Sequence, residues 1–582
     1  MKIIALVFLI LVAGCQSTPS KEHLNVFSSE KHISYKEWNR TPECCTAKGS
    51  QAAVASGGTH SSKAGVEILK KGGNAVDAAV ATAFGIAVER PHSAGIGGGG
   101  FMTLHLNQKT PVDIFVDFRE TAPQKAHRDM YLDKAGNVIP NLSLKGPLSI
   151  ATPSFVAGLY AVHKKYGKLK WKDVVEPAAL IAERGFLVYP SLQKAIERAN
   201  DSLLEDAFLR SLLFKNGHPL QVGDRLVQKD LAKTIRTLGT QGEKFFKGAL
   251  PKKIASFVQS KGGILDAKDF SKYEVKFREP IRGKFKNTSF ISAPPPSAGG
   301  VLISEAFNTL SGYDLGEISK NPGEYIHLVT EVLKRVYADR FQYLGDSDFV
   351  KLDYANLLTE ENAASLRKSI HLHKATPSLE IKNPKVQAGS GTHTSHLSVV
   401  DAEGNAVATT ITINTSFGSG MAVPGTGIIL NNEMDDFSSK VGVANAYGLV
   451  SSEANGIEPG KRPVSSMTPT IFFRDGKPVL VVGGAGGSRI ITGVLETSLN
   501  YLQLFPNDVR RSVFAPRFHH QWLPDELSLE GDLTVLTDEL KSKGQILSSR
   551  SYSPVIEAVG VNAEGQFTAT FDPRDEGGAE AY

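Results

Sequence analysis

Cysteine is scarce in this chain, with three residues among 582. Cys44 and Cys45 are adjacent in the sequence, and neighbouring cysteines rarely pair because a disulfide needs well separated Cα atoms. No third cysteine or histidine lies close to them, and the 15 histidines do not fall at the spacings of metal ligands. The sequence therefore predicts no metal, and it assigns no function to these two thiols; exposed, redox-active thiols are the alternative.

A large excess of one charge sign is also lacking. The chain has 65 basic and 60 acidic residues, a net charge of +5, and no basic block with interleaved aromatic residues. This pattern argues against nucleic-acid binding. Hydrophobic residues make up 41% and charged residues 21%, which is typical of a globular enzyme with a substantial core.

The apolar run that follows Lys2 is too short to cross a bilayer, so residues 1–14 are predicted to be an export signal. Its last residues, Val-Ala-Gly before Cys15, are similar to a bacterial lipobox, and Cys15 is then the lipidated first residue of the mature protein. An ordinary signal peptide is the alternative. Gln16 favours the outer membrane of a Gram-negative cell, so a periplasmic, lipid-anchored protein is expected. Residues 15–46 are polar and irregular, and are predicted to be a flexible tether.

Residues 390–418 have the composition of a β-hairpin, with two runs rich in Thr, Val and Ile around a turn cluster. If the turn is centred near Glu403, Thr394 faces Thr412 across the hairpin, and Asn414 lies two residues further along the same face. The sequence thus predicts that hydroxyl groups and an amide meet at one strand end.

Residues 374–391 contain proline and glycine without apolar periodicity, and are predicted to be an exposed tether that is easily cut. A cut just before Thr394 turns its hydroxyl into a nucleophile and its new α-amine, with an ordinary pKa of about 7.7 to 8.0, into a base. A threonine-rich hairpin without a catalytic role is the alternative that this stretch alone leaves open.

Four further motifs follow in the small C-terminal part of the chain: Asn431-Asn-Glu-Met-Asp-Asp-Phe437, Arg462-Pro-Val-Ser-Ser-Met-Thr-Pro-Thr470, Gly483-Gly-Ala-Gly-Gly-Ser-Arg489 and Ala515-Pro-Arg-Phe-His-His-Gln-Trp522. Together with Thr394-Ser-His-Leu-Ser-Val-Val-Asp401, they closely resemble the γ-glutamyltransferases, which are glutathione hydrolases of the N-terminal nucleophile superfamily. The resemblance extends over residues 47–582, and five long motifs in the same order are specific.

The resemblance implies an α+β fold, a four-layer αββα sandwich of the N-terminal nucleophile hydrolase type. It also implies a precursor that is cut between His393 and Thr394 into a large subunit, residues 47–393, and a small catalytic subunit, residues 394–582, which together form a heterodimer. The implied substrates are glutathione and other γ-glutamyl compounds, with water, amino acids or dipeptides as acceptors and no cofactor.

Residue roles follow from the same resemblance. The catalytic residues are Thr394 as nucleophile, Thr412 as its hydrogen-bond partner, and Gly486 and Gly487 as oxyanion donors. The substrate-binding residues are Arg119, Ser465 and Ser466 for the α-carboxylate, Asn414, Glu433 and Asp436 for the polar end of the donor, and Tyr447 in a lid at residues 438–461. Two carboxylates suit an α-ammonium group, and a guanidinium suits a carboxylate.

The rest of the chain is predicted to be scaffold. Helices are expected from Ser62 to Gly72, from Asn74 to about Glu89, and at residues 155–166 and 325–343, with strands at 101–106 and near 275–292. Residues 112–119 alternate as a half-buried edge strand that ends in Arg119. The glycine run before Phe101 leads into a strand, which argues against a phosphate-binding loop. A cephalosporin acylase, a poly-γ-glutamate depolymerase, or a non-processing lipoprotein that binds or scaffolds are the alternatives for the whole chain.

Overall fold

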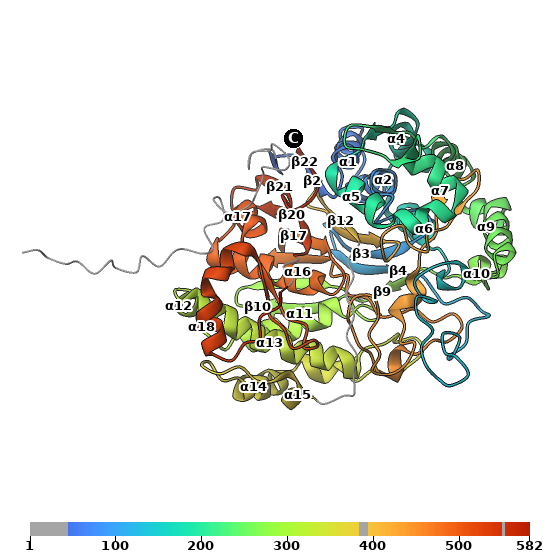
Figure 1. Cartoon of the computed structure of the whole chain (residues 1–582). Helices are drawn as coiled ribbons and strands as arrows, with labels where there is room; N and C mark the ends of the chain where they lie inside the picture. Colours follow the sequence, from blue (N-terminus) through green and yellow to red (C-terminus); the bar gives the residue numbers. More distant parts are fainter. Residues whose placement is uncertain (1–44, 383–393, 550–552) are drawn as a thin grey trace, which may run out of the picture.

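The computed structural model describes residues 45–382, 394–549 and 553–582, without the side chains of residues 245 and 246 (Figure 1). The predicted signal, Cys15, Cys44 and nearly all of the first tether lie outside the described residues. So do residues 383–393, the last part of the second tether. In the part of that tether that is described, Ser378–Ile381 forms the short helix α15.

Two antiparallel sheets of seven strands each form the centre of the molecule (Figure 1). The first sheet has the order β1 (Thr46–Gly49), β21 (Phe567–Phe571), β20 (Val555–Val561), β17 (Lys477–Ala485), β16 (Thr470–Arg474), β11 (Thr288–Ser292) and β10 (Ile281–Phe285). The second has the order β22 (Gly578–Ala581), β2 (Ala53–Ser56), β12 (Ser395–Val400), β13 (Ala406–Thr412), β3 (Gly99–Leu106), β4 (Val112–Phe118) and β9 (Lys276–Arg278).

The inner faces of the two sheets pack against each other through one buried cluster. The second sheet contributes small side chains such as Ala53 and Ala408, and the first contributes larger ones such as Ile471, Val481 and Val559. Because side chains alternate along a strand, the opposite face of each sheet is left for helices to cover.

On the outer face of the second sheet lie α1 (Thr59–Lys70) and α2 (Ala75–Glu89). All residues of α2 are buried, and the side chain of Asn74 caps its first turn. Beside α2, α3 (Phe155–Tyr166) also packs directly on β3 and β4. Outside α2 lies α4 (Trp171–Arg184), and α8 (Lys229–Gln241) packs on α4. The same half of the chain forms α5 (Pro190–Arg198), α6 (Asn200–Glu205), α7 (Ala207–Leu213), α9 (Ala249–Ser260) and α10 (Ala267–Lys272).

On the outer face of the first sheet lie α11 (Gly299–Leu310), α16 (Arg489–Leu499) and α17 (Val509–Phe514). The long helix α13 (Pro322–Tyr343) packs on α11 from outside, with α14 (Glu360–Ser369) beside it (Figure 1). The layers are therefore helix, sheet, sheet, helix, and the predicted αββα sandwich is confirmed. None of the described helices is both long and apolar enough to cross a membrane.

The predicted hairpin is confirmed in its register, because Ser395 pairs with Ile411 and the pairing places Thr394 opposite Thr412. The prediction for residues 112–119 was wrong in one respect. β4 is not an edge strand, since β9 continues the sheet beyond it, and its last four residues are buried on both faces. Cys45 is buried against Phe514 and Phe571, so it is not an exposed thiol.

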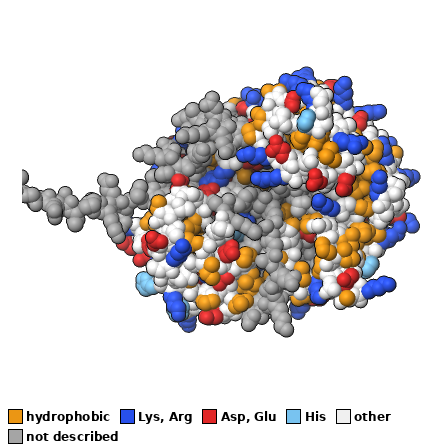
Figure 2. All heavy atoms as spheres, in the orientation of Figure 1, with side chains coloured by type: hydrophobic (Ala, Val, Ile, Leu, Met, Phe, Trp, Pro, Cys, Tyr) orange, Lys and Arg blue, Asp and Glu red, His pale blue; other side chains and the backbone are white. Residues whose placement is uncertain are grey.

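On the face shown in Figure 2, basic and acidic side chains are interspersed with hydrophobic ones. This mixed pattern agrees with the small net charge of +5. A surface of this kind offers no extended field of one sign to a polyanion.

Candidate active site

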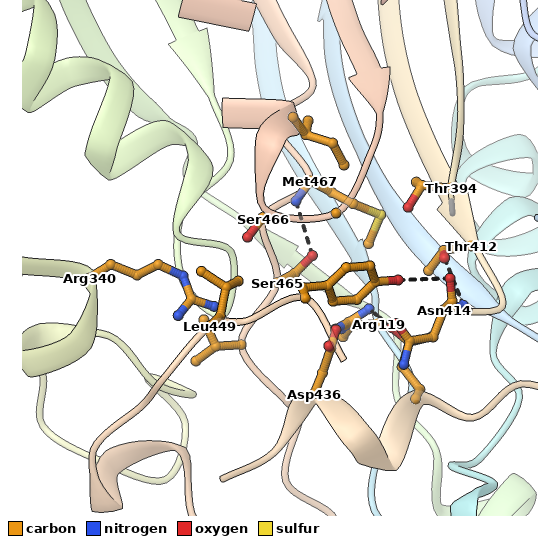
Figure 3. Close-up of a pocket in the computed structure, with 15 residues that line it drawn as sticks. Arg119, Arg340, Thr394, Thr412, Asn414, Asp436, Leu449, Ser465, Ser466 and Met467 are labelled. Carbon is orange, nitrogen blue, oxygen red and sulfur yellow. Dashed lines mark hydrogen bonds and ion pairs between the residues drawn. The ribbon is translucent and has the colours of Figure 1, made fainter. Parts of the chain in front are cut away.

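The strand ends of the second sheet bring the predicted nucleophile and its partners together. Thr394 directly precedes β12, Thr412 is the last residue of β13, and Arg119 follows the last residue of β4. Because neighbouring strands are antiparallel, these three positions share one edge of the sheet. In the view of Figure 3, the side chain of Thr394 lies above that of Thr412, and Asn414 lies below Thr412.

The first sheet supplies the other wall of the site. Gly486 and Gly487 follow the end of β17, and Ser465 and Ser466 lie shortly before β16 begins, so both segments reach the same edge. The proline-rich loop before α11 supports Ser465, which donates its N–H to the Pro296 carbonyl at 3.0 Å. The backbone carbonyl of Ser465 accepts from the N–H of Ala298 at 2.8 Å. The two sheets thus meet around one site.

The space between these side chains is small, about 20 Å³. It is lined by all the polar site residues predicted from the sequence, together with Arg340, Leu449, Val464, Met467 and Ile490 (Figure 3). A volume of this size holds about one water molecule. The site as it stands is therefore narrow.

Arg119 forms buried ion pairs with the two carboxylates that the sequence assigns to the donor. Its guanidinium donates through one terminal nitrogen to Glu433 and through the other to Asp436. Burial alone lowers the pKa of Arg119, but the charges of Glu433 and Asp436 outweigh it and raise that pKa. Burial raises the pKa of Glu433 well above its ordinary value, and Arg119 only partly opposes this shift.

Four polar atoms of residues that line the site have no hydrogen-bond partner among the described residues. They are Oγ of Ser466, Oδ1 of Asn414, Oε2 of Glu433 and Nε of Arg340. Buried polar atoms are almost always paired, so four unpaired ones around one cavity indicate a polar ligand. Two of them accept, Nε of Arg340 donates and the Ser466 hydroxyl can do either, which matches a group with an ammonium and a carboxylate.

The backbone conformation at positions 486 and 487, and the space beside position 487, both favour glycine. Gly486 and Gly487 have φ angles of +135° and +59°. A Cβ atom on Gly487 would lie 2.2 Å from the ring of Tyr447. Among the described residues, no backbone carbonyl accepts the N–H of either glycine. Unobstructed N–H groups at such a turn can point at a developing oxyanion.

Tyr447, the residue predicted to belong to a lid, is one of those that line the site. Its side chain is 6% exposed, and its hydroxyl donates to the carbonyl of Asn414 at 2.8 Å (Figure 3). Burial raises the pKa of this hydroxyl well above its ordinary value, so it stays protonated and remains a donor.

Sequence reasoning missed two charged residues of the site. Glu120 is fully buried beside Arg119, and burial raises its pKa to about 7. Arg340 comes from α13, where burial lowers its pKa to about 10, and the charge of Asp436 partly opposes that shift. Glu120 could have been found, since it follows Arg119 directly. Arg340 gave no signal, because charged residues spaced along a helix normally indicate a solvent-facing side.

Within the described ranges, no group of three or more His, Cys, Asp or Glu side chains is placed to hold a metal ion. The chemistry available to the site is that of a hydroxyl nucleophile, backbone donors and paired charges. Such a set suits acyl transfer, in which an ester on the nucleophile forms and is then released.

Residues 61–582 match the family model described as Gamma-glutamyltranspeptidase. The chain is 44% identical over 473 residues to the glutathione hydrolase proenzyme of Pseudomonas sp. (strain A14), covering 81% of each chain. It is 41% identical over 530 residues to the glutathione hydrolase proenzyme of Escherichia coli (strain K12), covering 90% of this chain and 91% of the relative. The cephalosporin acylase from Bacillus halodurans, 24% identical, shares the fold with a TM-score of 0.80 over 92% of this chain and 97% of its own.

Proposed function

Because the chain belongs to the γ-glutamyltranspeptidase family, we propose that it cleaves the γ-glutamyl amide bond of glutathione and of related small γ-glutamyl compounds. The acceptor of the γ-glutamyl group is water or the amine of an amino acid or dipeptide. The observation that supports this most is the narrow site between the two sheets, where Thr394 lies opposite Thr412 and shares the lining with a buried arginine and its carboxylates.

The proposed reaction uses the mature amino terminus as its base. The α-amine of Thr394 takes the proton of the Thr394 hydroxyl, whose oxygen attacks the γ-carbonyl carbon of the donor. The negative charge on the carbonyl oxygen is stabilised by the N–H groups of Gly486 and Gly487. The amide C–N bond breaks, the leaving amine takes the proton from the α-ammonium, and an ester on Thr394 remains. Water or an acceptor amine then attacks the ester carbonyl carbon and gives up a proton to the same base as the new bond forms. The ester C–O bond breaks, and the Thr394 oxygen takes the proton back from the α-ammonium, which regenerates the hydroxyl and the free amine.

Recognition of the donor follows from the charges in the site. Arg119, Ser465 and Ser466 are proposed to bind the α-carboxylate. The α-ammonium group is proposed to bind Glu433, Asp436 and the side-chain oxygen of Asn414. Arg119 contacts Glu433 and Asp436 directly. When a donor binds, its carboxylate pairs with Arg119 and its ammonium pairs with the two carboxylates, so no charge in the site is left without a partner.

A cut between His393 and Thr394 is proposed as the activating step, and residues 394–582 as the small catalytic subunit. Two observations support this cut. The relatives are named proenzymes, and the proposed reaction needs the free α-amine of Thr394 as its base. A small donor is favoured over a bulky acyl group because Tyr447 is part of the lining and narrows the site.

The test combines processing and turnover. The purified protein should separate into two chains under denaturing conditions, and the smaller should begin Thr-Ser-His-Leu. It should release the chromophore from a γ-glutamyl anilide, and faster when glycylglycine is added as acceptor. Thr394→Ala should remain one inactive chain. A single uncut chain with full activity would contradict the proposed mechanism.

We also propose that the protein is exported and lipid-anchored through Cys15, in the periplasm and on the outer membrane. The support is the Val-Ala-Gly sequence before Cys15 and the Gln16 that follows it. The protein should incorporate labelled palmitate and fractionate with membranes, whereas Cys15→Ser should prevent the labelling. Unlabelled parent protein found free in the periplasm would exclude the anchor. One acyl chain binds membranes weakly, so stable attachment needs several.

A further inference from the structure

We propose that Gln521 is a positioning residue that holds Tyr447 over the donor site. Gln521 belongs to the motif at residues 515–522, for which the catalytic scheme has no use. It is 8% exposed, and its side-chain nitrogen donates to the backbone carbonyl of Tyr447 at 3.3 Å. Together with the bond from the tyrosine hydroxyl to Asn414, this contact fixes Tyr447 at both its backbone and its ring.

The orientation of the Gln521 amide is fixed by its surroundings. Its nitrogen lies near two backbone carbonyls, those of Tyr447 and Leu523, each at 3.3 Å. Carbonyls only accept, so the nitrogen must face them. Its oxygen lies 2.7 Å from the hydroxyl of Ser488, which donates to it, and 3.0 Å from Nε2 of His519.

The oxygen side of Gln521 is attached to the helix that follows the glycine pair. Ser488 directly precedes α16, and His519 contacts Thr492 of that helix through Nδ1 at 2.8 Å. Burial lowers the pKa of His519 well below its ordinary value, so the ring is neutral. Its Nε2 then carries the single proton and donates to Gln521, while Nδ1 accepts from the Thr492 hydroxyl.

Gln521 therefore links the lid to the wall that bears Gly486 and Gly487. The bond from Ser488, which follows Gly487, is 2.7 Å long, and the bond from His519, which contacts α16, is 3.0 Å long, whereas the bond to the lid is 3.3 Å long. Because Tyr447 is part of the lining of this narrow cavity, its position determines the room left for a donor. If Tyr447 moves when a donor enters, we expect the longer bond to break first, while Gln521 stays bonded to Ser488 and His519.

This inference deepens the proposed function and rests on the donor binding beneath Tyr447, but its first test does not depend on activity. In Gln521→Leu, the amide hydrogens of residues 445–450 should exchange with solvent about tenfold faster than in the parent, since the hydrogen bond from Gln521 to the Tyr447 carbonyl is lost. Gln521→Glu at pH 8 should behave similarly, because a carboxylate cannot donate to the two carbonyls. Unchanged exchange at residues 445–450 in a folded Gln521→Leu protein would overturn the proposal.

The second test measures turnover of the γ-glutamyl anilide. Gln521→Leu should raise KM about tenfold and change kcat less than threefold, since the lid confines the donor but does not touch the reacting atoms. The matched control is Gln545→Leu, which removes another buried glutamine that contacts a histidine, His327, and does not line the site. It should leave both KM and exchange at 445–450 unchanged. An equal rise in KM in both variants would show a general loss of structure and overturn the specific role. A parent without turnover would refute the proposed function, while the exchange test would still decide on Gln521.

Discussion

Replacing Arg119 by alanine removes the only guanidinium that contacts Glu433 and Asp436 in the described part of the site. The arginine and Glu433 are each 1% exposed, so solvent cannot take over the lost contacts. Truncating one partner of a buried ion pair costs about 3 to 5 kcal/mol. A donor carboxylate that loses its charge-assisted bonds loses about 3 to 4 kcal/mol, so kcat/KM for a γ-glutamyl anilide should fall several hundredfold.

The same variant should still be cut between His393 and Thr394, because that step involves no γ-glutamyl group. Both quantities are therefore measured on one preparation, subunit cleavage by gel and turnover by absorbance. The control is Arg236→Ala, which removes an arginine that also bridges two carboxylates, Glu176 and Glu183, but at the surface. Its turnover should stay within a factor of two of the parent. Parental kcat/KM in processed Arg119→Ala would remove this arginine from the donor site.

Two further changes test other parts of the site. Gly487→Ala should displace Tyr447, because the new Cβ would lie 2.2 Å from the tyrosine ring and a φ of +59° strains alanine. KM for the γ-glutamyl anilide should therefore rise. In a double-mutant cycle, the same change should raise KM less when Tyr447 has already been replaced by alanine. Glu120→Gln should alter the pH dependence of stability, because burial raises the pKa of Glu120 from 4.5 to about 7. The folded state holds the proton of Glu120 more tightly than the unfolded state does. The protonated side chain therefore contributes to the free energy of unfolding below pH 4.5, and this contribution, up to about 3 kcal/mol, is lost as the pH rises towards 7. Thermal melts should therefore show a shallower fall over that range in the variant; parallel curves would contradict this assignment.

The sequence predicts the hairpin register because side chains alternate strictly along strands. Once the turn is placed at Glu403, the facing positions follow, and Thr394 and Thr412 meet as the structure has them. The glycine pair is predictable for a similar reason, since a strand that ends in consecutive glycines needs backbone that other residues avoid. Local rules of this kind act over a few residues and need no knowledge of the fold.

Long-range packing is what the sequence could not supply. Arg340 reaches the site only because α13 packs on α11, and its own helix carries charges that local rules assign to solvent. The same limit explains β4. The alternation at residues 112–119 indicates a half-buried strand, but whether another strand lies beside it depends on β9, more than 150 residues later. A pattern within one strand contains no information about its neighbour.

The order of strands explains how one cut can activate the chain without separating its parts. In the first sheet, β21 to β16 lie after the cut and are flanked by β1 and β11 from before it; in the second, β12 and β13 lie between β2 and β3. Strand pairs across the cut therefore occur in both sheets. Separation of the two chains would break the backbone hydrogen bonds between strands and expose the core between the sheets, so it would require unfolding. The new amino terminus stays at the start of β12, between two paired strands, so the fold that builds the site also holds the base in place once the peptide bond is gone.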